Sequence, residues 1–132
     1  MTARLLLDTH VVVRWLCDAK RLSREQLRAI DQCERRGEPL GVSAITLLEV
    51  AILARAGELR IEGLLEEFLE TLDRKPFRIL PLTPAVAFEA GSLRSLKDPA
   101  DRVIAATARV HGLQLVTSDE RIVASSVVRT VT

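Results

Sequence analysis

Short apolar runs that alternate with longer amphipathic segments constrain the fold of this chain most strongly. The short runs have the length and composition of strands and lie at residues 5–7, 39–42, 77–80, 113–116 and 127–131. The longer segments between them have the length and periodicity of helices. Strands separated by helices form a mostly parallel sheet with helices on both faces. The alternation therefore predicts an α/β fold, a three-layer α/β/α sandwich with a mostly parallel central sheet.

Capping residues indicate where the helices begin and end. Ser23 with Gln26 three positions later forms a capping box, and Thr83 and Asp98 each precede a proline that suits the first position of a helix. Glycine follows several of the periodic segments and marks their ends. We expect helices over residues 11–17, 23–37, 45–56, 61–72, 83–93 and 98–111.

The length of 132 residues suits one compact domain with its own core, and we expect a single domain over residues 1–132. No apolar stretch approaches the roughly 20 residues that a membrane-spanning helix needs, and no secretory signal opens the chain. Cys17 and Cys33 lie in predicted helices and form neither a zinc set nor a disulfide framework. These features favour a cytoplasmic protein without a membrane partner.

A net charge of +1 gives no overall basic field, so a nucleic acid would have to bind a local patch. With one Trp, three Phe and no Tyr, a platform that stacks bases is not expected. Basic residues near the acidic positions described next could bind RNA phosphates, although scattered basic residues are usually solvated surface. These candidates are Arg14, Arg94, Lys97 and Arg102.

A set of acidic residues lies at the boundaries of the predicted elements. Its members are Asp8, Glu49, Asp98, Asp101 and Asp119. Each one alone also has a structural explanation, since three could cap helices, one could be a first-turn acid and Glu49 could be a solvated helix residue. No single member therefore establishes a site.

The joint placement of these acids predicts a metal site. Asp8 and Asp119 directly follow separate strands, and parallel sheets bind ligands at the carboxyl ends of their strands. Two carboxylates about 4 Å apart repel by roughly 4 kcal/mol at an effective dielectric of about 20, so a crevice with several of them recruits a cation or a proton. Oxygen ligands without His or Cys suit Mg²⁺ or Mn²⁺, which points to hydrolysis of a phosphodiester.

Four sequence motifs, in this order and spacing, resemble the PIN-domain ribonucleases that act as VapC-type toxins. They are Leu5-Leu6-Leu7-Asp8-Thr9-His10, Val42-Ser43-Ala44-Ile45-Thr46-Leu47-Leu48-Glu49, Asp98-Pro99-Ala100-Asp101-Arg102 and Leu115-Val116-Thr117-Ser118-Asp119. The resemblance covers nearly the whole chain. It implies a PIN-like fold and a Mg²⁺- or Mn²⁺-dependent endoribonuclease that is the toxin of a toxin–antitoxin pair.

The resemblance also implies roles for particular residues. The acids that match the family's metal site and catalytic set are Asp8, Glu49, Asp101 and Asp119, with Asp98 as an additional participant. Thr9, Ser43 and Thr117 match hydroxyl positions that support the acidic pocket, and they could equally be helix caps. One subgroup carries a His shortly before the Asp-Pro pair, where this chain has Leu96 and Lys97.

The resemblance implies an RNA substrate, a homodimer and a cognate antitoxin whose tail lies across the active-site groove. The apolar helical segments at residues 45–56 and 61–72 could form such interfaces, but packing against the sheet would produce the same pattern. The sequence does not name the RNA, the cleavage site, the number of metal ions or the antitoxin.

Two other functions are disfavoured by the sequence, and one alternative to the nuclease stays open. A dehalogenase-like phosphatase would need a second acid two positions after Asp8, where this chain has His10, and no glycine-rich phosphate loop follows a strand. The alternative is a catalytically inactive PIN-like scaffold that serves as a binding or regulatory module. Retention of all four acids disfavours it, because a pure binding role does not require a self-repelling set.

Overall fold

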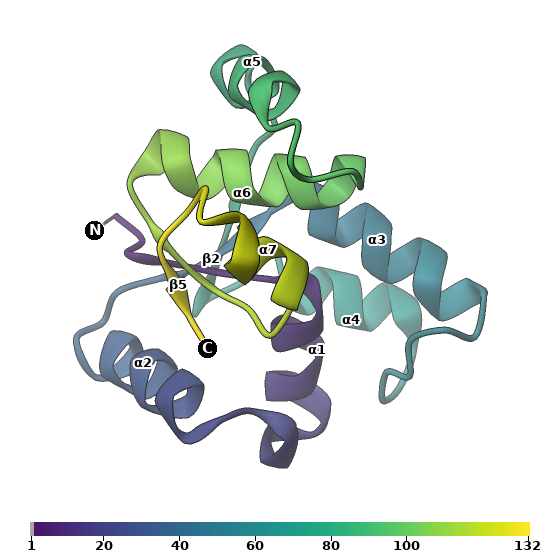
Figure 1. Ribbon diagram of the computed structural model, residues 1–132. Coiled ribbons are helices and arrows are strands. Elements are labelled where there is room, and N and C mark those ends of the chain that lie inside the picture. The colour runs from purple at the N-terminus through teal and green to yellow at the C-terminus, as the bar shows by residue number, and fades with distance from the viewer. Residues whose placement is uncertain (1) are drawn as a thin grey trace.

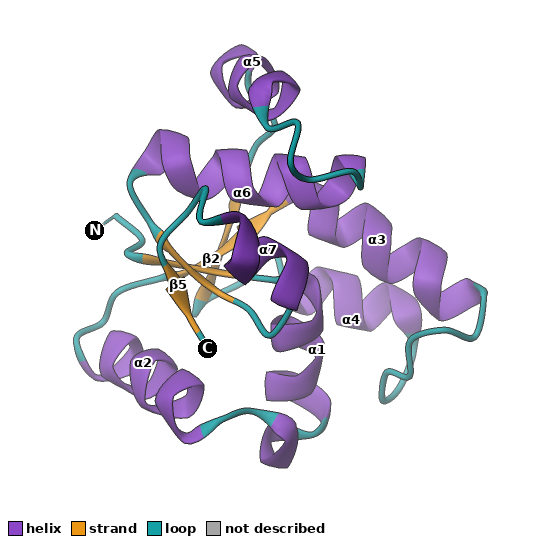
Figure 2. Cartoon of the chain, in the orientation of Figure 1, coloured by secondary structure: helices purple, strands orange, loops and turns teal. Residues whose placement is uncertain are grey.

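The computed structural model describes residues 2–132 as strands and helices that alternate along the chain (Figures 1 and 2). The strands are β1 (Leu5–Leu7), β2 (Leu40–Ser43), β3 (Phe77–Leu80), β4 (Gln114–Val116) and β5 (Thr130–Val131). The helices are α1 (Thr9–Cys17), the 3₁₀ turn η1 (Ala19–Arg21), α2 (Arg24–Arg35), α3 (Ala44–Arg55), α4 (Leu65–Thr71), α5 (Pro84–Ser92), α6 (Pro99–His111) and α7 (Glu120–Ser125).

Within residues 2–132 the strands form one five-stranded sheet in the order β3-β2-β1-β4-β5. Every neighbouring pair is parallel, with Leu6 of β1 opposite Gly41 of β2 and Leu115 of β4. The predicted parallel sheet is therefore confirmed. The chain runs outward from β1 to β3 on one side and returns to β4 on the other, so the switch in strand order lies between β1 and β4, where parallel sheets place their ligand sites.

Helices cover both faces of the sheet, as the predicted three-layer sandwich requires. Leu5 and Leu7 of β1 pack in a core cluster with residues of α1 to α4, whereas Leu6 packs in a second cluster with residues of α5 to α7. This alternation follows from the two-residue repeat of a strand. Figure 1 shows α5 and α6 on one side of the strands and α1 and α2 on the other.

Gly41 shows how closely the central strands approach. A Cβ atom at this position of β2 would lie 2.8 Å from the carbonyl oxygen of Leu5 and 3.4 Å from the side chains of Leu6 and Leu80. Because the first contact is with backbone, a side chain here would push β1 and β2 apart. The glycine thus keeps the strand that carries the first acid close to its neighbour.

The expected helix over residues 61–72 is the main error in the predicted elements. The helix α4 begins only at Leu65, and Gly63 before it has a φ of +77° that ends any helical run through this segment. The apolar side chains Ile61 and Leu65 still pack against the core, so the apolar pattern was correct, while the predicted helix holds only from Leu65 to Thr71 and not before it.

Smaller differences concern the short elements. The strand expected over residues 127–131 is reduced to Thr130–Val131, and neither η1 nor α7 was predicted. The capping box at Ser23 and Gln26 and the N-caps Thr83 and Asp98 are confirmed. No helix within residues 2–132 has the length and apolar character needed to cross a membrane, and both cysteines are free thiols.

Candidate active site

Asp8 is the buried centre of the candidate site. It follows β1 directly and is only 5% exposed. Its Oδ1 accepts a hydrogen bond from the Thr9 backbone N–H at 2.8 Å, and its Oδ2 accepts one from the Thr117 hydroxyl at 2.7 Å. Burial raises the pKa of Asp8, while these two hydrogen bonds and the charge of His10 act in the opposite direction. The carboxylate is therefore held in one orientation at the end of the central strand.

Glu49 reaches the same region from the second turn of α3. The Thr9 hydroxyl donates to Glu49 Oε1 at 2.6 Å, and Thr46 Oγ1 lies 3.0 Å from Thr9 Oγ1. Because the Thr9 proton is used by Glu49, the Thr46 hydroxyl is the donor in the second contact. Thr46 is fully buried and was not predicted; a polar residue three positions before Glu49, on the inward face of an apolar helix, was the available signal.

The loop after β4 contributes Thr117 and Asp119 to the candidate site, on the other side of Asp8 from Glu49. The Thr117 oxygen that donates to Asp8 also accepts the backbone N–H of Asp119 at 3.0 Å. Gln26, fully buried in α2, donates from its side-chain amide to Ser118 Oγ at 2.9 Å. The sequence indicated only a capping role for Gln26. In the structure this residue also connects the start of α2 to the loop that carries Asp119.

The N-terminal end of α6 brings two more acids. Asp98 is exposed and caps the helix by accepting the Ala100 N–H at 3.1 Å, whereas Asp101 is buried with 8% exposure. The pKa of Asp101 is raised to about 7 by burial and then by the charges of Asp98, Asp119, Asp8 and Glu49. The predicted acids therefore come together in space, although they are far apart in the sequence.

Arg121 was not predicted, although an arginine two residues after an acid was a visible signal. Its NH2 lies 3.2 Å from Asp119 Oδ2 and 4.0 Å from Asp101 Oδ2. Burial alone would raise the pKa of Asp119, but hydrogen bonds from Arg121 and its charge outweigh that effect and lower the pKa. Burial also raises the pKa of Glu49, despite the hydrogen bond from Thr9.

The donor chemistry of this cluster fits a hard divalent cation. Among the described residues, no three acidic, histidine or cysteine side chains already stand in the arrangement of a formed metal site. The cluster nevertheless brings several like charges together, which add to burial in raising the pKa of Asp101, and it offers oxygen donors alone. The residues that would hold Mg²⁺ or Mn²⁺ are Asp8, Glu49, Asp101 and Asp119.

The remaining predicted residues take varied positions. Ser43 is buried and caps α3 by accepting the Ile45 N–H at 3.3 Å. Arg102 donates from Nε to the Leu96 carbonyl, so part of its guanidinium is used inside the protein. Lys97 is exposed just before Asp98. Arg14 lines a groove of ≈ 710 Å³ together with His10, Arg21 and Arg60, and with the acids Asp18, Glu58 and Glu62.

The chain is similar to proteins of known type. A match to the PIN domain family covers residues 5–126, a span that includes every acid of the cluster. Ribonuclease VapC22 of Mycobacterium tuberculosis is 38% identical over 120 residues, which cover 89% of this chain and 88% of that protein. The DNA-bound VapBC of Salmonella typhimurium shares the fold, with a TM-score of 0.69 at 21% identity over 97% of this chain and 96% of that chain. FitAcB of Neisseria gonorrhoeae has a TM-score of 0.63 at 29% identity, with 97% and 96% covered.

Proposed function

The chain belongs to the PIN domain family, as a ribonuclease toxin of the VapC type, and we propose that it cuts RNA with a divalent cation held by its acidic cluster. The observation that carries this proposal is the convergence of Asp8, Glu49, Asp101 and Asp119 at the carboxyl ends of β1 and β4. Chains with this many like charges in one crevice are stabilised by a bound cation. A catalytically inactive scaffold would gain nothing from the mutual repulsion of these carboxylates.

The residues of the cluster have distinct parts in this chemistry. When bound, Mg²⁺ or Mn²⁺ would lower the pKa of a water and neutralise charge on the scissile phosphate. Thr9 and Thr117 fix the Asp8 carboxylate through both of its oxygens, so that ligand needs little rearrangement. Without a cation, burial and neighbouring acids raise the pKa values of Asp101 and Glu49, which favours binding of a positive charge beside them. A carboxylate of the cluster would take the proton of the attacking water.

We also propose a protein antitoxin as partner and a homodimer as the free form. Three of the similar solved structures are named VapBC, VapBC2 and VapBC-1, and another is a toxin–antitoxin complex from Klebsiella pneumoniae. Exposed apolar side chains on this chain are consistent with a protein interface: Leu48 and Ile52, one turn apart on α3, are 54% and 57% exposed, and Leu64 is 66% exposed. Because cellular RNA is the proposed substrate, the cytoplasm is the compartment in which we expect the protein to act.

The test is cleavage of total cellular RNA by antitoxin-free protein. We expect discrete cuts with Mg²⁺ or Mn²⁺, none with chelator and none with Asp8→Asn. Asp73→Asn is the matched control, since Asp73 is an exposed acid in the turn between α4 and β3 and lies far from the cluster. If the folded protein neither cuts RNA nor binds the cation, the nuclease proposal is wrong and the catalytically inactive scaffold is favoured.

A further inference from the structure

Arg121 is a cation placed directly on the acidic cluster. Its side chain is 77% exposed, whereas the side chains alone of Asp119 and Asp101 beside it are 20% and 12% exposed. Its guanidinium forms a fork on Asp119, with Nε 3.4 Å from Oδ1 and NH2 3.2 Å from Oδ2. The same NH2 faces Asp101 on α6 at 4.0 Å. One arginine therefore connects the acids at the starts of two helices.

The fold has little need for this arrangement. Asp119 already caps α7 by accepting the Arg121 backbone N–H at 2.9 Å, and that hydrogen bond does not involve the guanidinium. Ion pairs of side chains as exposed as Arg121 contribute little to stability, because water screens them and ordering the side chain costs entropy. The position of the guanidinium is better explained by the charge that it meets.

A carboxylate and a phosphate present the same target to arginine. Each offers two oxygens to the planar fork of a guanidinium, which is why arginine binds both in the same bidentate way. If a divalent cation takes Asp119 and Asp101, the guanidinium loses its acidic partners and stands beside a concentrated positive charge. An anion brought to that cation, such as an RNA phosphate, is then its natural partner.

We propose that Arg121 is a phosphate-binding residue of this nuclease that rests on Asp119 and Asp101 until a divalent cation and RNA arrive. This inference rests on the proposed function, because it needs RNA and a cation at the same cluster. It makes Arg121 a competitor of the cation in the free protein and a ligand of the substrate in the complex. The two roles predict opposite effects of removing it.

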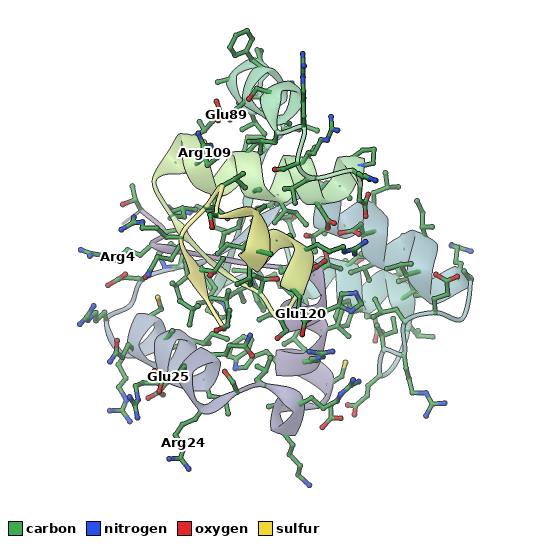
Figure 3. All side chains as sticks on the ribbon, in the orientation of Figure 1. Arg4, Arg24, Glu25, Glu89, Arg109 and Glu120 are labelled. Atoms are coloured by element: carbon green, nitrogen blue, oxygen red, sulfur yellow. The ribbon has the colours of Figure 1, made fainter. Side chains whose placement is uncertain are left out.

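The first test measures cation affinity by titration calorimetry with Mn²⁺ alone. Arg121→Gln removes the competing charge, so we expect Mn²⁺ to bind more tightly by about threefold to tenfold. Arg24→Gln is the matched control, since Arg24 is an exposed arginine at the start of α2, on the far side of the molecule from α6 (Figure 3), and we expect no change. Thermal unfolding of each variant verifies that the fold is intact.

The second test measures RNA affinity by fluorescence anisotropy with a single-stranded oligoribonucleotide and Mn²⁺. The oligoribonucleotide is one that the wild-type protein leaves uncut on a denaturing gel, so wild-type and Arg121→Gln protein are compared with Asp8 and the other acids in place. We expect the RNA to bind more weakly by about threefold to tenfold, and the slope of log affinity against log salt to fall by about 0.7, as for one lost phosphate contact on a single strand. Arg24→Gln in the otherwise wild-type protein should leave the slope as it was.

Unchanged Mn²⁺ affinity and an unchanged salt slope in Arg121→Gln, with a wild-type protein that still cuts RNA, would overturn the inference and leave Arg121 as a surface ion pair. A wild-type protein that cuts no RNA would instead contradict the proposed function. That result is obtained before any variant at position 121 is made, so the two failures are distinguishable.

Discussion

Buried acids at the two ends of the sheet have opposite neighbours: arginines at the amino end and further acids at the carboxyl end. At the amino end, Glu38 before β2 is only 6% exposed and lies between two arginines, with Oε2 3.2 Å from Arg4 Nε and Oε1 3.9 Å from Arg36 NH1. Arg109 and Glu89 form a more exposed pair on α6 and α5, at 2.6 Å (Figure 3). At the carboxyl end, Asp8 is held by hydroxyl and amide donors and has further acids around it.

This difference separates the part of the molecule that stabilises the fold from the part that we assign to chemistry. Glu38 has positive charge beside it, whereas like charges that converge raise one another's pKa and favour a bound cation or proton. Strain of this kind gathers at functional sites and is compensated elsewhere in the structure. Changes at the two ends should therefore have opposite effects on activity and on stability.

The largest expected effect is that of Asp8→Asn at the carboxyl end. Asparagine keeps the shape, and its Oδ1 can still accept the Thr9 N–H, but its amide nitrogen can only donate where Asp8 accepted the Thr117 hydroxyl. It also removes a charged ligand, so we expect RNA cleavage to fall by at least about a hundredfold. The thermal midpoint of the metal-free protein should stay the same or rise, because a buried charge has gone. A variant that still cuts at the wild-type rate would remove Asp8 from the site.

The next largest effect is that of Glu38→Ala at the amino end, which should lower stability and leave RNA cleavage unchanged. It creates a small void, while Arg4 and Arg36, whose side chains are 73% and 62% exposed, return to water, so we expect the free energy of unfolding to fall by about 1 kcal/mol. Denaturant unfolding measures this loss. Cleavage at a temperature where the variant is folded should match wild type, and a large loss of activity there would break the separation of the two ends.

A smaller effect is expected for Thr117→Val, which tests whether the hydroxyls at the carboxyl end serve the cluster. Valine has nearly the same shape but cannot donate to Asp8 Oδ2 or accept from the Asp119 N–H. We expect Mn²⁺ affinity and cleavage to fall by about tenfold, as for other groups that orient metal ligands. Thr71→Val is the control, because that hydroxyl donates only to a backbone carbonyl within exposed α4.

The smallest effect is a pH dependence of the metal-free protein. The pKa of Asp101 is about 7 in the folded state against an ordinary value of 3.8, so between these values the folded protein holds a proton that the unfolded chain has lost. Stability should therefore fall as the pH rises through 7, by about 1 kcal/mol from pH 6 to pH 8, or a few degrees in thermal midpoint. The same scan on Asp101→Asn should have a smaller slope, to which Asp8 and Glu49 still contribute because their pKa values are also raised; an equal slope in that variant would assign the effect to another group.

Much of the fold was predictable because its signals are local. Ser23, Thr83 and Asp98 cap helices in the way that their side chains and the following residues indicate. The helix α7 was missed because six residues offer too little periodicity to detect. The segment before α4 was misassigned because its apolar spacing fits a helix, while the conformation of Gly63 depends on how the chain turns between α3 and α4.

The site was predictable in part for the same reason. The acids follow strands or begin helices, so their positions in the sequence place them at one edge of a parallel sheet. Thr46, Gln26 and Arg121 were missed because their roles depend on contacts between distant segments, such as the Gln26–Ser118 hydrogen bond across 92 positions. Whether the acids bind a cation stays a prediction.

The pairing of β1 with β4 has a consequence for the synthesis of the protein. Asp8 is among the first residues made, but the hydroxyl that holds it belongs to Thr117, and that hydrogen bond spans 109 positions. Ribosomes add about 5–20 residues per second, so for several seconds a nascent chain carries the first acid of the cluster without the last. While it is attached to the ribosome, a growing chain therefore lacks the complete acidic cluster, although the RNAs of translation lie beside it. A chain that stops before residue 117 never acquires the cluster.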